Sequence, residues 1–546
     1  MLLEWFMGSY YKISELKEAR RVKLNQELVT TLKSQKEIRC FNYDRKKIKT
    51  ATLAAPIWLH FGAGNIFRGF IATLQNQLLE DGKSDKGIIV VETYDTGIID
   101  LAYKPYDDLN VSVTLKRDGS VNKEIIGSVI ESVKSDKEGW QRLIHFFEED
   151  SLQMVTFTIT EKGYSVSSYE TDFEREPEVS ESLMGQLTYL CYCRYKKGGK
   201  PIAVVSLDNC SQNGKKLQEA VCKFAEEWIK RGKMDAAFKT YLQDPKRVSF
   251  PWSMIDKITP QPNKKVQEML IKAGFEEMPI IKTSKNTWVA PFVNAEEIQY
   301  LVIEDSFPNG RPCLEDAGVI FTTREEVERT EKMKVCTCLN PLHTALAIFG
   351  CLLDYKTIDE AVGNPLLLQL IEKIGYEEGL PVVTSPAMVN PYHFIKEVIE
   401  IRLPNPFILD SPWRIIADTS LKMPIRFGET LKAYKRQGEN KIEQLTYIPL
   451  VIAGWCRYLL GINDAGKAYE VGPDPRGAIL QKALEGLYLG KNENISLKLA
   501  PILSDESLFG VNLYEVGLGT KVEHYFAELT ADKNVIQKVL DKYLMQ

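Results

Sequence analysis

The sequence predicts an α/β protein in two parts, a first domain with a parallel sheet and a second domain that is mostly α-helical. Two observations lead to this fold class. Up to about residue 300, short apolar β-rich runs alternate with amphipathic stretches, which is typical of a parallel sheet with helices on both faces. After about residue 305, strand-like runs become scarce and long segments with helical apolar periodicity replace them. We therefore expect an N-terminal extension over 1–53, the α/β domain over 54–304 and the helical domain over 305–546.

The individual elements follow from the same patterns. The expected strands are the apolar runs Ile57–Phe61, Gly87–Glu92, Met154–Thr160 and Ile202–Leu207. The helices expected between them are Ile71–Glu80, Trp140–Glu148 and Leu217–Arg231. In the second part the expected helices are Glu326–Leu353, Pro365–Tyr376, Tyr392–Arg402, Gly428–Lys435 and Leu450–Leu460. Interleaved Lys and Glu residues predict that the first 53 residues form a helical extension on the outside of the first domain.

Composition excludes several classes of function. The chain has 546 residues, of which 44% are hydrophobic, and its net charge of −5 with 69 dispersed Lys and Arg argues against a nucleic-acid partner. No apolar run approaches the roughly 20 residues of a membrane span, and the start Met1–Gly8 lacks the basic flank of a secretion signal. The ten cysteines show no disulfide or metal spacing beyond Cys336-Thr-Cys338, which we interpret as core thiols. These features are typical of a protein of the reducing cytoplasm.

A glycine loop after the first strand predicts a dinucleotide site. Gly62-Ala-Gly64 follows an apolar strand and opens a helix, so the first glycine allows a tight turn and the second lets the backbone approach a pyrophosphate. Phe67 occupies the third glycine position of the usual fingerprint. The second strand ends in Glu92, where an acidic side chain accepts from a ribose 2′-hydroxyl and repels a 2′-phosphate, which favours NAD over NADP. In the alternative interpretation, Glu92 is a solvated strand end.

A second group of polar residues lies on one helical stretch of the second part. The segment Glu331–Ala347 carries Lys334, Asn340 and His343 among small and apolar residues. Burial lowers the pKa of a lysine towards the range of a general base, and Asn and His side chains can donate to an oxygen that gains charge when a carbonyl is reduced. In the alternative interpretation, Lys334 is a surface residue of the helix and His343 a hydrogen-bonded core histidine.

Eight ordered motifs give the chain a family resemblance. They are Gly62-Ala-Gly-Asn-Ile-Phe-Arg68, Thr160-Glu-Lys-Gly-Tyr164, Ser206-Leu-Asp-Asn209 with Asn213-Gly214, Ser253–Pro260, Ile303–Pro312, the Lys/Asn/His segment, Arg402-Leu-Pro-Asn-Pro406 and Asp418-Thr-Ser-Leu-Lys422. In this order they resemble the long-chain mannitol dehydrogenase family. The resemblance implies a Rossmann-type N-terminal domain that binds NAD, a helical C-terminal substrate domain, and an active site between them.

The resemblance also implies roles for single residues. Lys334 is the expected general base, Asn209 and Asn340 the pair that stabilises the oxyanion, and His343 and Arg402 contacts to the substrate. The family needs no metal ion, because the lysine replaces the zinc of other alcohol dehydrogenases.

The same resemblance places the cofactor. Gly62, Gly64, Asn65 and Ile66 belong to the family's Gly-x-Gly-x-x-x-Arg motif and are expected to contact NAD together with Glu92.

One spacing departs from the family pattern. The family has four residues between the lysine and the asparagine, whereas five separate Lys334 from Asn340. In an α-helix the extra residue would rotate Asn340 by about 100° relative to Lys334. Either a π-bulge absorbs the residue, or the base lies elsewhere, with Lys332 as the alternative.

Within the family, the sequences of Phe307–Pro312 and Cys338–Thr344 are most similar to the branch that reduces hexuronates. The implied reaction is D-mannonate + NAD ⇌ D-fructuronate + NADH, with Arg402 or Lys422 binding the substrate carboxylate. The alternatives are tagaturonate reduction, the oxidation of mannitol, and a protein that binds NAD or a sugar acid without catalysis. A binding protein has no need of a base, which argues against the last alternative.

Overall fold

The computed structural model describes residues 23–32, 37–490 and 493–545. The chain divides into two compact units, Met1–Leu115 with Ser120–Arg324, and Lys116–Gly119 with Glu325–Gln546. The boundary near residue 324 lies beyond the one expected at 304/305, because β13 and β14 of the first unit pair with each other across that position. The expected extension over 1–53 lies partly outside the described residues, and its described part belongs to the first unit.

A six-stranded parallel sheet forms the centre of the first unit, which confirms the expected fold class. Its strands are β1 (Trp58–Phe61), β2 (Ile88–Glu92), β5 (Val129–Lys134), β6 (Met154–Phe157), β7 (Ile202–Ser206) and β8 (Val248–Ser249). They lie in the order β5-β2-β1-β6-β7-β8. The order reverses between β1 and β6, and ligands of such sheets bind beside the carboxyl ends of the strands at this switch point.

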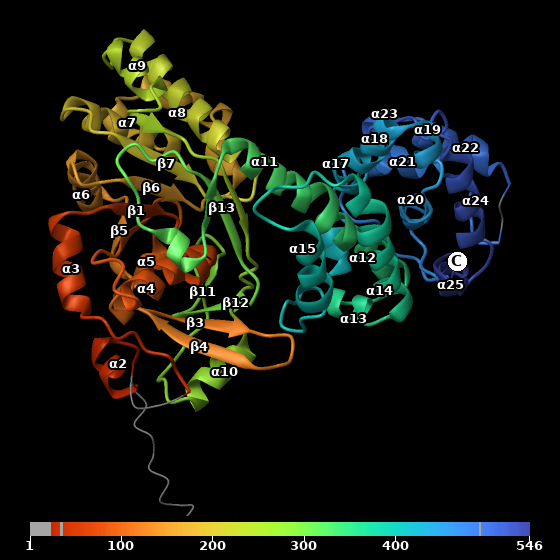
Figure 1. The fold of residues 1–546 in the computed structure, drawn as a ribbon, viewed down its shortest axis with the longest axis horizontal. Helices are drawn as coiled ribbons and strands as arrows, with labels where there is room; N and C mark the ends of the chain where they lie inside the picture. The colour runs from red at the N-terminus through yellow and green to blue at the C-terminus, as the bar shows by residue number, and fades with distance from the viewer. Residues whose placement is uncertain (1–22, 33–36, 491–492, 546) are drawn as a thin grey trace, which may run out of the picture. The chain divides into compact units, whose positions relative to one another are not determined.

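The sheet is buried on both faces, which is why its strands read as continuous apolar runs. Leu59, Val91 and Val155 face one core with α6 (Lys137–Glu148), α7 (Leu183–Lys196) and α8 (Asn213–Lys230). The alternating residues Trp58 and Val90 face another core with α4 (Ala72–Glu80) and α5 (Gly97–Ala102). Figure 1 shows α7 and α8 on one side of β6 and β7, and α4 and α5 on the other side of the sheet.

The remaining elements of the first unit surround this sheet. Its helices are α2 (Gln26–Leu32), α3 (Arg45–Ala54), the π turn η1 (Phe67–Ile71), α4 (Ala72–Glu80), α5 (Gly97–Ala102), α6 (Lys137–Glu148), α7 (Leu183–Lys196), α8 (Asn213–Lys230), α9 (Ala237–Gln243) and α10 (Lys264–Lys272). Short 3₁₀ turns are η2 (Lys104–Tyr106), η3 (Glu161–Tyr164), η4 (Ser167–Glu174), η5 (Pro177–Val179) and η6 (Leu314–Ala317).

Three smaller sheets complete the first unit. Their strands are β3 (Asn110–Leu115), β4 (Val121–Ile126), β9 (Ser253–Asp256), β10 (Ile281–Lys282), β11 (Trp288–Val289), β12 (Phe292–Glu296), β13 (Tyr300–Glu304) and β14 (Ile320–Thr322). They pair in the orders β12-β3-β4, β14-β13-β9 and β10-β11.

The described residues of the second unit form helices and no β-strand, as expected. The helices are α11 (Arg324–Met333), the π turn η7 (Lys334–Cys338), α12 (Asn340–Leu352), α13 (Ile358–Val362), α14 (Pro365–Glu372), the π turn η8 (Lys373–Gly379), η9 (Leu380–Val382), α15 (Pro391–Glu397), the π turn η10 (Val398–Arg402), α16 (Pro412–Ile415), α17 (Thr419–Arg426), α18 (Gly428–Gln437), α19 (Glu439–Ile442), α20 (Tyr447–Tyr458), α21 (Gly477–Ala483), α22 (Ile495–Leu503), α23 (Glu506–Phe509), α24 (Gly519–Leu529) and α25 (Ile536–Leu544).

The helical run Arg324–Leu352 is the core helix of this unit. The run has 29 residues, and an 18-residue window within it has a mean hydropathy of 1.5, which by length and composition would suffice to cross a membrane, although the sequence shows no uninterrupted apolar run of that length. However, 78% of the apolar window is buried inside the protein, where α12 packs against α16 and α20. A helix that is apolar on all sides and covered by other helices is a core helix.

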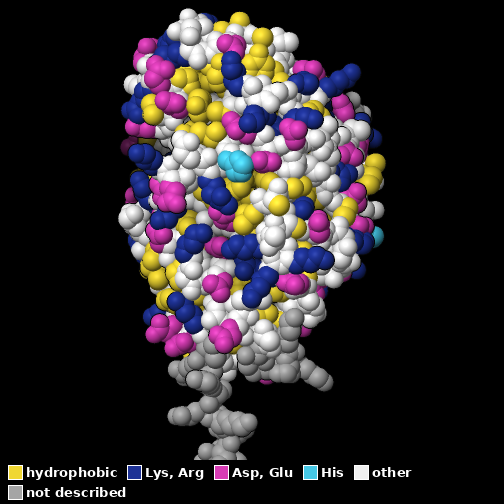
Figure 2. Space-filling model, turned by 90° about the vertical axis from the view of Figure 1, so that its left-hand side faces the viewer, with side chains coloured by type: hydrophobic (Ala, Val, Ile, Leu, Met, Phe, Trp, Pro, Cys, Tyr) yellow, Lys and Arg dark blue, Asp and Glu magenta, His cyan; other side chains and the backbone are white. Residues whose placement is uncertain are grey.

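Charged side chains of both signs are interspersed over one face of the first unit (Figure 2). This mixture agrees with the near balance of 69 basic and 74 acidic residues in the sequence. On this face the protein does not present a field of one sign.

A fully buried arginine joins the segments that lead into β6 and β7. The guanidinium group of Arg194, on α7, donates to backbone carbonyl oxygens at 2.8–3.0 Å, those of Phe147, Glu149, Leu152, Lys200 and Pro201. These carbonyls belong to the segments that lead into β6 and β7. The planar fork of arginine satisfies several acceptors at once, which no other side chain can do.

We expect Arg194→Met to lower the free energy of unfolding by at least about 3 kcal/mol, because it leaves several buried carbonyls without donors. Urea denaturation followed by fluorescence measures the change. Lys196→Met, two residues further on, removes an exposed ion pair with Asp235 and should leave the midpoint unchanged. An Arg194→Met protein that unfolds at the wild-type urea concentration would contradict this role.

Candidate active site

The glycine loop lies at the carboxyl end of β1, beside the switch point of the sheet. Gly62 has φ of 107°, and a Cβ there would lie 2.2 Å from the carbonyl oxygen of Thr158, so this position requires glycine. A Cβ at Gly64 would meet no atom within 4 Å. The first glycine therefore serves the fold, and the second faces open space that a ligand can approach.

Glu92 fixes the conformation of this loop. One carboxylate oxygen accepts the backbone N–H of Ala63 at 2.8 Å, and the other accepts those of Thr93, Tyr94 and Asp95 at 3.0–3.1 Å. The side chain is buried, with 7% of its surface exposed. Glu92 is therefore not a solvated strand end, and it links the ends of β1 and β2.

The arginine of the same motif is structural. Arg68 is fully buried and donates to the carbonyl oxygen of Ala290 at 2.6 Å and to Oδ1 of Asn65 at 2.9 Å. Its guanidinium lies 5.7 Å from the ring centroid of Tyr103, whose hydroxyl donates to the carbonyl of Ala63 at 2.9 Å. Ile66 is half-buried beside these residues. The loop is thus held from both ends.

A second carboxylate shapes the neighbouring strand ends. Asp208, after β7, accepts the backbone N–H groups of Ile159 and Thr160 at 2.9–3.0 Å and the hydroxyl of Tyr164 at 2.5 Å. Burial raises the pKa of Asp208 and, more strongly, that of Tyr164. The motifs Thr160–Tyr164 and Ser206–Asn209 therefore contact each other, and they leave Asn209 exposed beyond the end of β7.

Two further motifs meet at the same place. The side-chain amide of Asn213 donates to the carbonyl oxygen of Asp208 at 3.0 Å and to that of Ser253 at 2.9 Å. The Ser253 hydroxyl donates to the carbonyl of Ser206 at 2.6 Å. Motifs that are scattered along the sequence thus converge at the carboxyl edge of the sheet and set the position of Asn209.

In the second unit, Lys334 begins a π turn where the extra residue was noted. The N–H of Leu339 donates to the carbonyl of Lys334 at 3.0 Å, an i→i+5 bond, and α12 restarts at Asn340 with Pro341 in its first turn. Lys334 is 2% exposed. Of the two alternatives for the extra residue, the structure contains the π-bulge, and Lys334 is a buried residue rather than a surface one.

His343 lies among charged side chains, of which the sequence patterns had singled out Arg402 alone. Its Nε2 lies 3.6 Å from the carboxylate of Asp410, which Arg414 also holds through two hydrogen bonds. Burial lowers the pKa of His343 to about 4; Asp410 opposes this shift, and Arg426, Arg414 and Arg402 add to it. The imidazole is therefore neutral at neutral pH.

The two cations expected to bind the substrate differ in their surroundings. Arg402 ends the π turn η10, is 3% exposed and lies close enough to His343 to lower the pKa of its imidazole. The ammonium group of Lys422 donates to the backbone carbonyls of Ile415 and Ala417, and burial lowers its pKa. Lys422 thus stabilises the end of α16.

The structure therefore places the predicted residues in two groups. Gly62, Gly64, Asn65, Ile66, Glu92 and Asn209 belong to the first unit, and Lys334, Asn340, His343, Arg402 and Lys422 belong to the second. Sequence reasoning missed Asp410 and Arg426. Asp410 has an i,i+4 partner in Arg414, and Arg426 follows Lys422 at the same spacing, which are the signals that could have identified them.

Comparison with known proteins assigns the family. Residues 56–316 match the mannitol dehydrogenase Rossmann domain, and residues 326–543 match the mannitol dehydrogenase C-terminal domain. The chain belongs to the mannitol dehydrogenase family. It is an oxidoreductase of this family, acting on a CH–OH group.

Similar proteins cover nearly the whole chain. A D-mannonate oxidoreductase of Thermotoga maritima is 50% identical over 512 residues, 92% of this chain and 94% of that protein. One of Escherichia coli is 28% identical over 478 residues, 83% of this chain and 92% of that protein. A Pseudomonas fluorescens mannitol 2-dehydrogenase, solved in a ternary complex with NAD and D-mannitol, has a TM-score of 0.68 at 24% identity, covering 96% of this chain and 100% of that chain. A substrate-free D-sorbitol dehydrogenase has a TM-score of 0.77 at 22% identity with the same coverage, and both likenesses show the fold.

Two other observations concern metal binding and the cysteines of this mannitol dehydrogenase family member. Within residues 23–32, 37–490 and 493–545, no three His, Cys, Asp or Glu side chains form a metal-binding group. Cys338 is fully buried, and burial raises the pKa of Cys336 to about 12, as in core thiols.

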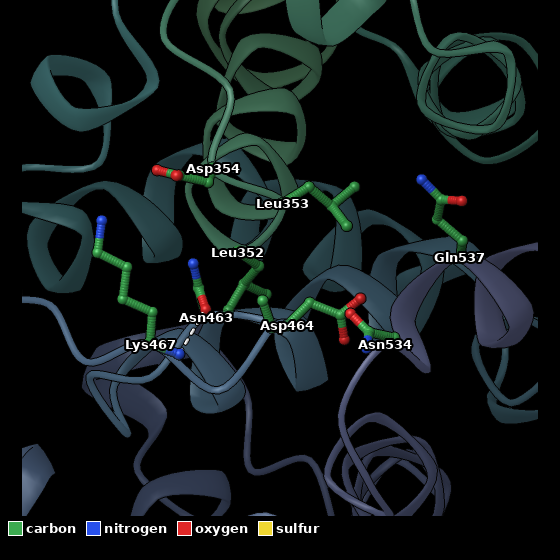
Figure 3. Close-up of a pocket in the computed structure, with 9 residues that line it drawn as sticks. Leu352, Leu353, Asp354, Asn463, Asp464, Lys467, Asn534 and Gln537 are labelled. Atoms are coloured by element: carbon green, nitrogen blue, oxygen red, sulfur yellow. Dashed lines mark hydrogen bonds between the residues drawn. The ribbon is translucent and has the colours of Figure 1, made fainter.

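A cavity of about 370 Å³ with a mixed polar and apolar lining lies at the C-terminal end of α12 (Figure 3). Asp354, Asn463, Lys467 and Gln537 line it. The π turn with Lys334 directly precedes the N-terminal end of α12. Because this helix has 13 residues, its two ends lie about 20 Å apart. The cavity is therefore not the surroundings of the predicted base.

The low pKa of His343 predicts that its ring does not titrate between about pH 8 and 5. Because the pKa falls below 6.5 on folding, the folded state binds fewer protons, and stability is lost as the pH drops from about 6.5 towards about 4. Ring ¹³C NMR of the five histidines measures this, with His343→Gln identifying the signal. A midpoint near 6.5 would show that the ring is solvated or ionised in the fold.

Proposed function

We propose that this chain is an NAD-dependent oxidoreductase that interconverts D-mannonate and D-fructuronate. The 50% identity with the Thermotoga maritima D-mannonate oxidoreductase, over 92% of the chain, supports the substrate. The burial of Lys334 on the helical run that also carries Asn340 and His343 supports the chemistry. The first unit would bind the cofactor and the second the substrate.

The glycine loop fits a dinucleotide. Gly64 has open space beside it, and a helix starts at the next residue, Asn65, so the first N–H groups of this helix would stabilise a pyrophosphate there. Oε2 of Glu92 accepts only the backbone N–H of Ala63, so it can accept one further hydrogen bond, for example from a ribose hydroxyl. Its negative charge disfavours a 2′-phosphate, hence NAD rather than NADP. Bound NAD would supply the hydride acceptor.

Lys334 would take the proton from the substrate hydroxyl during oxidation and return it during reduction. Burial disfavours the charged form of an amine, which is what a proton acceptor requires. The side-chain amides of Asn209 and Asn340 would donate to the substrate oxygen as it gains charge. His343, neutral and held by Asp410, would donate or accept a hydrogen bond from a substrate hydroxyl.

A sugar acid also needs a cation for its carboxylate. Arg402 is the stronger candidate of the two, because Lys422 already spends two of its three N–H donors on backbone carbonyls. Tagaturonate reduction and mannitol oxidation are the alternatives within the family.

All ten cysteines are free thiols, which supports a reducing cytoplasm as the location.

We expect the protein to oxidise NADH with fructuronate faster than with tagaturonate or fructose. The relevant quantity is kcat/KM for each ketose, from absorbance at fixed enzyme concentration. A preference for tagaturonate or fructose would reassign the substrate, and activity with none of them would favour the non-catalytic alternative.

Lys334→Ala should lower kcat by about 10³-fold while NADH still binds, because a general base contributes about 10²–10⁴-fold. Lys332→Ala is the matched control, since Lys332 is exposed, pairs with Glu328 and is the alternative base. Retained turnover in Lys334→Ala with a loss in Lys332→Ala would exchange the two assignments.

Glu92→Gln should weaken NADH binding about tenfold, because an amide cannot accept hydrogen bonds at both ends and so releases Ala63 or the N–H groups after β2. The preference for NADH over NADPH should also fall as the negative charge is lost. Titration of tryptophan fluorescence with each dinucleotide measures both effects, with the exposed Asp100→Asn as control. Unchanged binding of both dinucleotides would separate Glu92 from the cofactor site.

A further inference from the structure

The π turn at Lys334–Cys338 contains a carbonyl group that cannot follow its own hydrogen-bond pattern. The i→i+5 bond joins the N–H of Leu339 to the carbonyl of Lys334. The same spacing from Cys336 leads to Pro341, which has no N–H. Cys336 is half-buried, and a carbonyl shielded from water without a donor costs free energy, so a donor from elsewhere stabilises the turn.

Thr430 supplies this donor from another helix. Its hydroxyl, on α18, donates to the carbonyl of Cys336 at 3.3 Å, and the side chain is 5% exposed. The contact joins residues 94 positions apart in the sequence. Helix α18 thus satisfies the turn from outside the helical run Arg324–Leu352.

The same region of the chain also holds the other side of the turn. Arg426, at the end of α17, donates to the hydroxyl of Thr344 at 2.6 Å, and that hydroxyl donates to the carbonyl of Asn340 at 2.8 Å. The junction of α17 and α18 therefore contacts the chain both before and after Leu339, between the predicted base and the predicted oxyanion donor.

A third contact to this π turn comes from the π turn η8. A Cβ at Gly379, the last residue of η8, would lie 2.8 Å from Cγ2 of Thr337. The two π turns thus pack without a side chain between them, and Thr337 has little room to move.

From these contacts we infer that Thr430 is a positioning residue for Lys334, fixing the π turn that sets the direction of the amine relative to Asn340. This inference rests on the proposed role of Lys334 as the base. Thr430 itself acts only through the backbone of Cys336. A hydroxyl that merely stabilised the core would change the stability of the protein and leave the rate of proton transfer unchanged.

The test compares Thr430→Val with Thr430→Ser and with Thr330→Val. Valine keeps the shape of threonine and removes the donor, whereas serine restores the hydroxyl. Thr330 is the matched control, because it is equally buried and its hydroxyl donates to the Glu326 carbonyl at 2.7 Å within the regular helix α11. For Thr430→Val we expect kcat with fructuronate to fall about 10- to 100-fold with little change in the KM for NADH. Thr430→Ser should recover most of the loss, and Thr330→Val should show none.

Hydrogen–deuterium exchange of the wild-type and variant proteins gives a readout that does not depend on activity. The amide of Leu339, which makes the i→i+5 bond, should exchange about tenfold faster in Thr430→Val and at the wild-type rate in Thr330→Val. Faster exchange with unchanged kcat would overturn the positioning role, and so would equal exchange in the two variants. If Lys334→Ala retains turnover, the proposed function fails instead, because Lys334 is then not the base. The exchange rates would still show whether Thr430 stabilises the π turn.

Discussion

A proline in the middle of a long helical run determines the local structure around Lys334. Pro341 lies in the middle of the run Arg324–Leu352, where its ring would clash with the carbonyl of Thr337 in a regular α-helix. The chain instead forms a π turn, breaks at Leu339 with φ of −125°, and restarts α12 with the proline in its first turn. The direction of Lys334, the start of the helix with Asn340 and His343, and the need for Thr430 all follow from this constraint.

In the first unit, two carboxylates determine the shape of the loops at the carboxyl ends of the strands. Glu92 and Asp208 both lie just beyond the carboxyl ends of parallel strands, and each accepts several backbone N–H groups of a loop. Such loops have unpaired N–H groups because their strands have ended, and a carboxylate satisfies more of them than any neutral side chain. The glycine loop and the loop with Asn209 thus owe their shapes to two acidic residues at the ends of strands.

Sequence patterns predicted the central sheet well where burial on both faces left continuous apolar runs, as in β1, β2, β6 and β7. They missed β5, whose Glu131 and Ser132 interrupt the run, and β8, which has two residues. Five helical segments of the second unit were predicted, two of them continuous with the π turns η8 and η10, because apolar periodicity persists through these turns. Other helices, such as α17, α22, α24 and α25, were not predicted. For the candidate site, the motifs pointed to Lys334, Asn340 and His343, but not to Arg426 or Thr430, whose hydrogen-bond partners Thr344 and Cys336 lie 82 and 94 positions away in the chain. Asp410 was missed although Arg414 is its partner at i,i+4, because its contact with His343 depends on the tertiary structure.

The sequence by itself determined the order of the two parts, the family, and which residue types carry the expected chemistry, since these depend on local composition and spacing. It also determined that something irregular must separate Lys334 from Asn340. Only the tertiary structure decided that the irregularity is a π turn, that both oxygens of Glu92 bind backbone, and that His343 is neutral. Each of these depends on which polar groups meet inside the fold, and packing brings those groups together across distances in sequence that no local pattern records.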